Sequence, residues 1–565
     1  MPAKRHTQTP THSRKSQLDG GGREKVSNSS NSSVEEKAVR SSNMVTVLVL
    51  VSRITGFFRT SAQAWALGAY GLASAYTVAN NLPNTLYELV VGGMLITAFL
   101  PVYISVRKEA GREGASAYAS NLLSIVVLLM LILTVLSVIF AVPIVWTQSA
   151  GATEGFDSDL SVWFFRWFAC EIVLYALSSI ISGVLNAERD YFASNAAPII
   201  NNVIVIGSFV LYAYLVNSVG MEWRQAAIAL AVGNPLGVAV QALIQIPALM
   251  RHGVRLRLRV NFHDPALKKT LTIGLPTLVI TLASTPTAAV MSSCALQVTP
   301  AGASIAYYAR VWYVLPFSIF AIPISVTMFT ELSNSYMQED IASFKEFFIT
   351  GMRRILFTLI PFALFLIVFA SSLVAVLTSG SFTSESAVLT VGYLQALALS
   401  LPFYGIQSYL QKVCASMMRM NFFTAAVVIA SIIQCAICIV FTPLWGLYVV
   451  PVSSVFFYGV IDAVVIVHIR KELGAFGVRS VLVASLRAIA FGVAGSLVGG
   501  GIVYAITAAF GPSVGLVRGV LYAMAGGIPA VLVTFGISWA LGMSDAPFFD
   551  AIFARLLPGR AKAAR

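Results

Sequence analysis

Charged residues are scarce in this sequence. Asp, Glu, Lys and Arg make up 11% of the 565 residues, whereas soluble globular proteins carry roughly 25%. Apolar residues make up 57% of the chain, and long apolar runs recur from residue 44 to residue 541. A run of about 20 such residues crosses the ~30 Å hydrocarbon core of a membrane. The scarcity of charge therefore excludes a soluble domain and predicts an all-α, polytopic membrane protein.

Cysteine and histidine are also rare, and neither is placed for metal binding or catalysis. The five cysteines lie in apolar segments, and we interpret them as small packing residues. The five histidines fall in basic loops, in the N-terminal tail or at a helix end. A nucleotide-binding GxxxxGK[ST] motif is absent as well. The sequence predicts no enzyme activity, no metal and no cofactor, and leaves an ion gradient or the membrane potential as the energy source.

The net charge of +13 is distributed in a way that indicates topology. Lys and Arg recur in every second loop between the apolar runs, whereas intervening loops such as GAYG, QVTPAG and TSGSFTSES contain none. In membrane proteins, basic residues accumulate in cytoplasmic loops. The pattern therefore argues against nucleic-acid binding and predicts a multi-pass protein with both termini in the cytoplasm.

The apolar runs are predicted to form fourteen spans. Kinks are expected at the prolines within them, namely Pro83, Pro316, Pro361 and Pro402. The polar, low-complexity N-terminal segment is interpreted as a disordered cytoplasmic tail. The predicted units are the tail 1–43, an N-terminal lobe of six spans at 44–250, a C-terminal lobe of six spans at 267–470, spans 13 and 14 at 480–541, and a cytoplasmic tail at 542–565.

A faint internal repeat relates the first six spans to the next six. The segment LYALSSIISGVLNAERDYF aligns with FYGIQSYLQKVCASMMRMNFF, so that Tyr175 matches Tyr404 and Arg189 matches Arg419, at offsets of 229 and 230 residues. An even number of spans per copy makes the repeat parallel, with a pseudo-two-fold axis along the membrane normal. Two such lobes with a binding site between them are typical of a transporter.

Two arginines lie inside the first span, in the stretch VSRITGFFRT. Arg53 and Arg59 follow the start of the span by about ten and sixteen residues, which at 1.5 Å per residue places both within the bilayer. A central arginine costs roughly 2.5–3.5 kcal/mol there, and such residues usually face a water-filled cavity or a counter-charge. Guanidinium groups suit phosphate oxygens, so we interpret the pair as binding a bulky anion. Structural pairing with a buried carboxylate stays open as the alternative.

Other charged residues within the spans are candidates for the same cavity. Arg310 begins the eighth span and is a third candidate for anion binding, although its side chain could instead extend to the membrane surface. Glu88, Lys412 and Asp462 are candidate counter-charges or coupling groups, with Glu171 further out.

Several segments resemble the MurJ/MviN family of lipid II flippases. SRITGFFR and the later LPN resemble the opening of that family, SGVLNAERDYFASNAAPIINN is similar to its LN…F…P…N segment, and GMRRILFTLIPFALFLIV is similar to its ninth span. The residues that match the structural motif of the family are Asn84, Gly183, Asn186, Pro198 and Asn202.

The resemblance implies the fold of the MOP exporter superfamily, with two six-helix lobes around a solvated, cationic cavity that opens alternately to the two sides. It also implies movement of lipid II, the undecaprenyl-pyrophosphate-linked peptidoglycan precursor, from the inner to the outer leaflet of a bacterial plasma membrane. Arg53 and Arg59 coincide with cavity arginines of the family. The implied partners are the lipid-linked anionic substrate, membrane lipids and proteins of cell-wall synthesis or division.

The chain departs from the family pattern at four positions. Thr60 and Ser74 stand where acidic residues are usual, Tyr87 stands where a basic residue is frequent, and Val311 replaces an arginine one position after Arg310. These departures keep open another MOP-type exporter, moving a different polyprenyl-linked oligosaccharide or a drug. A membrane-bound transferase and a non-transporting cell-wall scaffold are further alternatives, of which the transferase lacks an acidic or histidine cluster in its outer loops.

Overall fold

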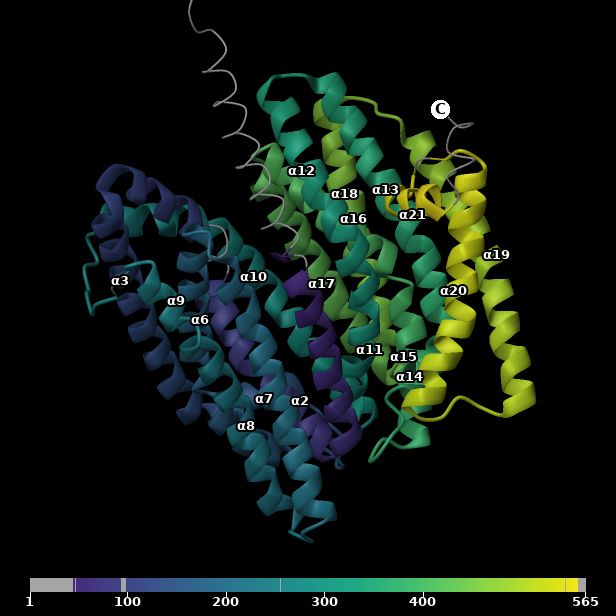
Figure 1. Ribbon diagram of the computed structural model, residues 1–565, viewed down its shortest axis with the longest axis horizontal. Helices are drawn as coiled ribbons and strands as arrows, with labels where there is room; N and C mark the ends of the chain where they lie inside the picture. Colours follow the sequence, from purple (N-terminus) through teal and green to yellow (C-terminus); the bar gives the residue numbers. More distant parts are fainter. Residues whose placement is uncertain (1–43, 46, 93–97, 255, 544, 557–565) are drawn as a thin grey trace, which may run out of the picture.

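The computed structural model describes residues 44–45, 47–92, 98–254, 256–543 and 545–556. Within these ranges every regular element is a helix, which confirms the predicted all-α fold (Figure 1). In a membrane, backbone N–H and C=O groups must be paired inside the protein, and a helix pairs them within one segment. The apolar runs therefore fold as helices. The predicted N-terminal tail and the end of the C-terminal tail lie outside the described residues.

The first bundle, named the N-lobe, begins with a helix at residues 47–67, which lies between the two bundles in Figure 1. The remaining elements of the N-lobe are α2 (Leu72–Tyr87), the π-helix η1 (Glu88–Gly92), α3 (Leu100–Ile139), α4 (Ala141–Ser149), α5 (Ser158–Phe168), α6 (Glu171–Ala187), α7 (Tyr191–Asn217), α8 (Trp223–Leu243) and α9 (Ile246–Arg251).

The second bundle, named the C-lobe, is followed by two long helices and a short one. The elements of the C-lobe are α10 (Pro265–Val298), α11 (Gly302–Pro316), the π-helix η3 (Phe317–Ala321), α12 (Ile322–Met337), α13 (Ile341–Val368), α14 (Ala370–Ala375), α15 (Ser384–Ala398), α16 (Leu401–Ser416), α17 (Met420–Trp445) and α18 (Val449–Leu473). The chain then forms α19 (Val478–Phe510), α20 (Leu516–Ala540) and α21 (Pro547–Leu556).

The number of membrane spans is compatible with the predicted fourteen. Among the described residues, ten helices are long and apolar enough to cross a membrane. Two helix pairs, bent by 41° between α5 and α6 and by 48° between α15 and α16, raise the number to twelve if each pair is one span. The other two predicted spans fall on helix 47–67 and on the segment of α2 and η1.

The prolines and the sharp bends do not coincide as expected. Pro83 and Pro361 lie inside α2 and α13, which continue through them, and Pro402 lies in the first turn of α16. Pro316 ends α11 and is followed directly by η3. The two bends above 40° fall instead between paired helices that are separated by two residues.

The predicted internal repeat is visible in the local geometry of both lobes. Short helices begin at Ala141 and Ala370, 229 residues apart, and the residue before each has the same φ of −95°. The left-handed φ values of Arg189 and Met418, 63° and 56°, are also 229 residues apart. The helices after the two bends begin at positions 171 and 401. The two lobes therefore share one architecture.

The lobes diverge towards α3 and α12 in Figure 1 and touch near their opposite ends. There the Tyr308 hydroxyl donates to the Gly68 carbonyl at 2.7 Å, and the Ser381 N–H donates to the Trp65 carbonyl at 3.0 Å. Ser74 donates to Ser304 across the same contact at 3.4 Å. The loops at this end are those with few basic residues. The described lobes are therefore joined on one side of the molecule.

The C-terminal helices pack on the C-lobe. In α19, a Cβ added at Gly499 would lie 2.2 Å from the Gly526 carbonyl of α20, so the two backbones approach too closely for any larger residue. The short helix α21 is preceded by Asp545, which accepts a hydrogen bond of 2.5 Å from Arg353 of α13. The first contact joins the two added spans to each other, the ion pair attaches the start of α21 to the C-lobe, and α19 itself packs along α13.

Candidate functional site

A polar pocket of about 440 Å³ lies between the two lobes. The N-lobe contributes residues of α2 and α4, and the C-lobe contributes residues of α10, α11, α15, α17 and α18. The polar residues that line this inter-lobe pocket are Asn81, Asn84, Thr85, Gln148, Thr287, Ser292, Tyr307, Arg310, Tyr313, Tyr393, Gln434, Ser454 and Tyr458. Amides, hydroxyls and a guanidinium group can form the hydrogen bonds that a polar ligand loses when it leaves bulk water.

Arg59 connects the first helix to the wall of this pocket. Its guanidinium group is partly buried and donates to the Tyr307 hydroxyl at 3.5 Å. The hydroxyl of Thr60 lies 3.4 Å from the same Tyr307 oxygen. Both residues of the N-lobe thus meet one tyrosine of α11 in the C-lobe. A tyrosine hydroxyl is a neutral partner, so the positive charge of Arg59 is not cancelled by this contact.

Arg53 and Arg310 lie on helices of opposite lobes. Both side chains are exposed in the structure, and both interact electrostatically with Tyr404 of α16. In the described part of the chain neither forms an ion pair or a hydrogen bond. Their donors are therefore available to a ligand, which an arginine locked against a carboxylate would not be.

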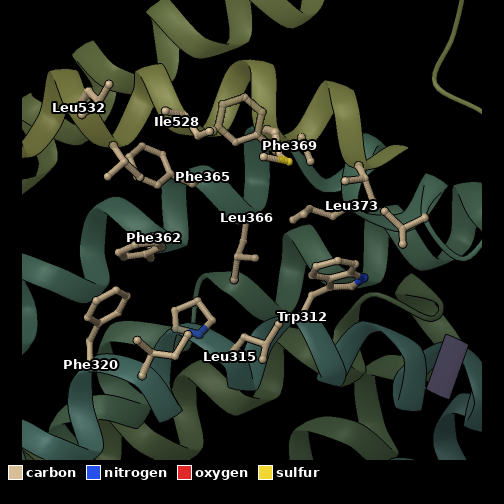
Figure 2. A pocket seen from close by; sticks show the side chains of 18 residues that line it. Trp312, Leu315, Phe320, Phe362, Phe365, Leu366, Phe369, Leu373, Ile528 and Leu532 are labelled. Atoms are coloured by element: carbon tan, nitrogen blue, oxygen red, sulfur yellow. The ribbon is translucent and has the colours of Figure 1, made fainter. Parts of the chain in front are cut away.

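An apolar pocket of about 580 Å³ lies on the other side of α11 (Figure 2). Its lining includes Trp312 and Leu315 of α11, Phe362 of α13, Phe369 between α13 and α14, and Ile528 of α20. Its aromatic and aliphatic side chains point towards one another across the space in Figure 2. Such a lining suits a hydrocarbon chain. Since Tyr313 lines the inter-lobe pocket, one helix separates a polar from an apolar site.

The sequence profile described as "Lipid II flippase MurJ" matches residues 63–518. The chain belongs to the MurJ family. The match covers most of the chain and includes both lobes and the start of α20, but it begins after Arg53 and Arg59. The resemblance inferred from the motifs is thereby confirmed, while the role of these two arginines stays a prediction.

Individual MurJ relatives are distant in sequence. A probable lipid II flippase MurJ of Rhizobium meliloti (strain 1021) is 27% identical over 371 residues, which cover 63% of this chain and 66% of the relative. The lipid II flippase MurJ of Burkholderia cenocepacia is 24% identical over 368 residues, which cover 64% of this chain and 69% of the relative. The chain thus spans about two thirds of the length of these relatives.

Solved structures share the fold. Lipid II flippase MurJ in an inward closed conformation matches with a TM-score of 0.68 at 20% identity, covering 88% of this chain and 99% of that one. An inward-facing multidrug resistance MATE transporter of the MOP superfamily matches with a TM-score of 0.62 at 16% identity, covering 76% and 98%. At these identities the comparison supports the two-lobe MOP fold alone.

The residues of the MurJ motif act mainly as packing and hydrogen-bonding groups. Asn202 of α7 donates to the Thr55 hydroxyl at 3.0 Å and to the Ser52 carbonyl at 3.3 Å, so it holds the first helix on both sides of Arg53. Asn186 accepts a hydrogen bond from Ser194 at 2.7 Å.

Two further motif residues are explained by shape. A Cβ added at Gly183 would lie 2.8 Å from the Phe99 ring, which requires a glycine there. Pro198 lies inside α7, where it removes one backbone donor without ending the helix.

The structure separates the three candidate counter-charges. Glu88 is exposed at the start of η1 and accepts from Asn84 at 3.0 Å, and Asn84 lines the inter-lobe pocket. Lys412 lies over the Phe329 ring at 5.6 Å and does not line the pocket. Asp462 is 6% exposed, and neither of its carboxylate oxygens has a hydrogen-bond partner among the described residues. None of the three forms an ion pair with Arg53 or Arg59 within the described chain.

Glu171, which the sequence analysis placed further out than the other candidate carboxyl groups, acts electrostatically on Arg59. It is 0% exposed and begins α6 directly after the bend from α5. The aromatic run AYYARVWYV, which contains Tyr307, was a usable signal for the partner of Arg59 because it surrounds an arginine with hydroxyl groups.

Proposed function

We propose that this protein moves lipid II from the inner to the outer leaflet by alternating access, without chemical change to the substrate. The observation that supports the proposal is the polar pocket between the lobes. Arg310 lines this pocket, Arg59 contacts its wall residue Tyr307, and Arg53 and Arg310 both act electrostatically on Tyr404. A pyrophosphate that leaves water needs such charge-assisted donors, because burial of an unpaired ion costs far more than thermal energy.

The two pockets divide the substrate by polarity. The inter-lobe pocket offers hydroxyl, amide and guanidinium groups to a pyrophosphate-linked sugar and peptide. The apolar pocket between α11, α13 and α20 offers about 580 Å³ to part of the lipid tail. Residues of α11 line both pockets, so the two pockets are close enough for one lipid II molecule to place its tail in one and its head group in the other. The tail can therefore stay in an apolar environment while the head group crosses.

The orientation follows from the basic loops. With these loops and both termini in the cytoplasm, the contacts of Ser74, Gly68 and Trp65 with the C-lobe lie on the outer side. These contacts close the outer side, and the diverging ends of the lobes face the cytoplasm (Figure 1). This is the state that accepts a substrate made on the inner leaflet. Transport then requires the outer contacts to break and the inner ends to approach.

The energy source is an ion gradient or the membrane potential. The sequence has no nucleotide-binding motif that could couple hydrolysis to movement. An anionic substrate moving outwards responds directly to a potential that is negative inside. Proteins of cell-wall synthesis or division are the expected protein partners, because they supply and consume the substrate at the membrane.

Depletion of the protein in its own host tests the proposal most directly. A lipid II-degrading enzyme added outside the cells, which acts only on the exposed pool, reports how much lipid II reaches the outer leaflet. We expect exposure to fall on depletion and to return with the wild-type gene. Unchanged exposure would remove lipid II transport and favour another MOP-type cargo, such as a different polyprenyl-linked oligosaccharide, whose exposure is assayed in parallel.

A further inference from the structure

Glu171 is a fully buried carboxyl group in the middle of a membrane span. Its Oε1 accepts a hydrogen bond from Asn234 of α8 at 3.0 Å, and its Oε2 accepts one from Tyr175 at 3.3 Å. Asn234 also donates to Asn80 of α2, so the cluster links three helices of the N-lobe. No arginine, lysine or histidine forms an ion pair with Glu171 among the described residues. A buried carboxylate without an ion pair is costly in hydrocarbon and is usually functional.

The fold itself does not require a carboxyl group at this bend. The C-lobe makes the equivalent bend between α15 and α16, at 48° against 41°, and the residue 229 positions after Glu171 is Ser400. Ser400 is fully buried and lies 2.9 Å from the Tyr313 hydroxyl, so a neutral hydroxyl completes the bend there. The N-lobe bend therefore holds an ionisable group that its structural counterpart lacks.

The groups around Glu171 oppose one another. Burial favours the neutral acid, whereas the N-terminus of α6, the two hydrogen-bond donors and the charge of Arg59 favour the carboxylate. The other titratable groups that face it are Tyr76 of α2 and Tyr175 of its own helix, both of which also interact with Arg59, and Cys170. Among the described residues, Arg59 is therefore the one cation whose charge acts on this carboxyl.

We infer that Glu171 is a proton-binding site whose occupancy is coupled to binding of the anionic substrate through Arg59. The inference rests on the proposed function in that the anion is the pyrophosphate of the substrate. When Glu171 is ionised, its charge competes with the pyrophosphate for Arg59. When Glu171 is protonated, Arg59 is free for the anion, and the bound anion in turn opposes ionisation of the acid. Proton and substrate therefore bind with positive coupling, which must be reciprocal.

We assign a proton as the ligand because the cluster supplies few oxygen ligands. A sodium or divalent cation needs several oxygens arranged around it, whereas this cluster has one carboxyl group, and the amide N–H groups of Asn234 point at Glu171 and Asn80. Among the described residues, no group of three or more His, Cys, Asp or Glu side chains could hold a metal ion.

Binding of lipid II to the full-length protein in lipid nanodiscs, measured at pH 5.5 to 8.5, tests the coupling. We expect the Kd of the wild type to rise about tenfold across this range, within the usual size of such couplings. Glu171→Gln, which keeps the shape and mimics the protonated acid, should bind tightly with a pH dependence below about twofold. Glu154→Gln, at an exposed glutamate in a loop, is the matched control and should titrate like the wild type.

Infrared difference spectroscopy provides a second measurement that needs no lipid II. Lowering the pH, or adding inorganic pyrophosphate at fixed pH, should produce a protonated carboxyl band that Glu171→Gln lacks and Glu171→Asp retains in shifted form. Lipid II binding with the same pH dependence in Glu171→Gln would overturn the proton site and leave the flippase intact. A dependence on sodium in place of pH would also overturn it. Absence of lipid II binding with the carboxyl band present would instead contradict the proposed function alone.

Discussion

At the scale of single residues, the first helix is held in place by one asparagine. Asn202 donates to Ser52 and Thr55, on either side of the arginine at position 53, and a Cβ added at Gly56 would lie 3.7 Å from its amide nitrogen. Asn202 touches neither arginine by a hydrogen bond and so acts by positioning the helix that carries them. The family motif residue thereby has a physical role in this chain.

Replacing Asn202 by alanine should loosen the first helix. The loss of two hydrogen bonds, one of them to a backbone carbonyl, is expected to cost about 1–2 kcal/mol. The melting temperature of the detergent-solubilised protein should fall. A thiol-reactive probe should also label a cysteine introduced by Phe57→Cys faster when Asn202 is replaced. Asn217→Ala, at the exposed end of the same helix, is the control and should change neither. Equal stability of the two variants would show that Asn202 does not hold this helix.

What the sequence predicted at this scale depends on the rarity of charge. Arg53, Arg59 and Arg310 stand out because arginine is expensive in a membrane span. Arg310 lines the inter-lobe pocket and Arg59 contacts its wall residue Tyr307, whereas the place of Arg53 in a binding site stays a prediction. Their partners could not be predicted. Arg59 meets Tyr307, 248 positions away, and interacts with Glu171, and both pairings depend on how helices of different lobes and spans pack.

At the scale of elements, the short helix α21 shows how a titratable group can control a contact. Burial raises the pKa of the Asp550 carboxyl from its ordinary value of 3.8 to about 6, and the charge of Asp545 adds to the effect. Asp550 therefore binds a proton more tightly when α21 is packed against the protein than when α21 is detached. Docking is strongest at low pH, and that contribution is lost as the pH rises from about 4 through 6.

Hydrogen–deuterium exchange in α21 checks this dependence. Between pH 4.5 and 7.5, after correction for intrinsic exchange, protection should fall by about 1 kcal/mol, because the partial exposure of Asp550 weakens the effect. Asp550→Asn should remove the dependence, and Glu346→Gln, at an exposed position of α13, should preserve it. Protection that rises with pH in the wild type would contradict the assignment.

The presence of helices was predictable from the sequence, but their bends were not. The apolar runs predicted helical spans because a helix pairs its backbone groups within the membrane. The bends fall between α5 and α6 and between α15 and α16, where no proline lies in the break. Kinks were expected at prolines because a proline removes one backbone hydrogen bond from a helix. Neighbouring helices can still support the chain at such a residue, and α2 and α13 continue through Pro83 and Pro361.

At the scale of the whole molecule, the repeat predicted from a few matched residues extends to caps, bends and left-handed turns. The lobe boundaries drawn from sequence stay predictions. The two lobes share one architecture but differ in side chains, and the proposed coupling group Glu171 has Ser400 as its counterpart at the equivalent bend of the C-lobe.

Locking the lobes at their joined ends should stop transport. The hydroxyls of Ser74 and Ser304 lie 3.4 Å apart across the lobes, so the double variant Ser74→Cys/Ser304→Cys should form a disulfide on oxidation. We expect transport to cease on oxidation and to recover on reduction, whereas each single variant should remain active under both conditions. Full transport by the cross-linked protein would mean that these ends need not separate.

The central claim is that the arginine-lined space between the lobes carries lipid II across the membrane, and translocation of labelled lipid II into the opposite leaflet of proteoliposomes tests it most directly. The wild type should move lipid II, and Arg59→Ala should move it at least about tenfold more slowly, as expected for a lost charge-assisted hydrogen bond. Arg224→Ala, at an arginine that lies over the Trp223 ring, should match the wild type. Wild-type rates in Arg59→Ala, or no translocation by the wild type, would contradict the account.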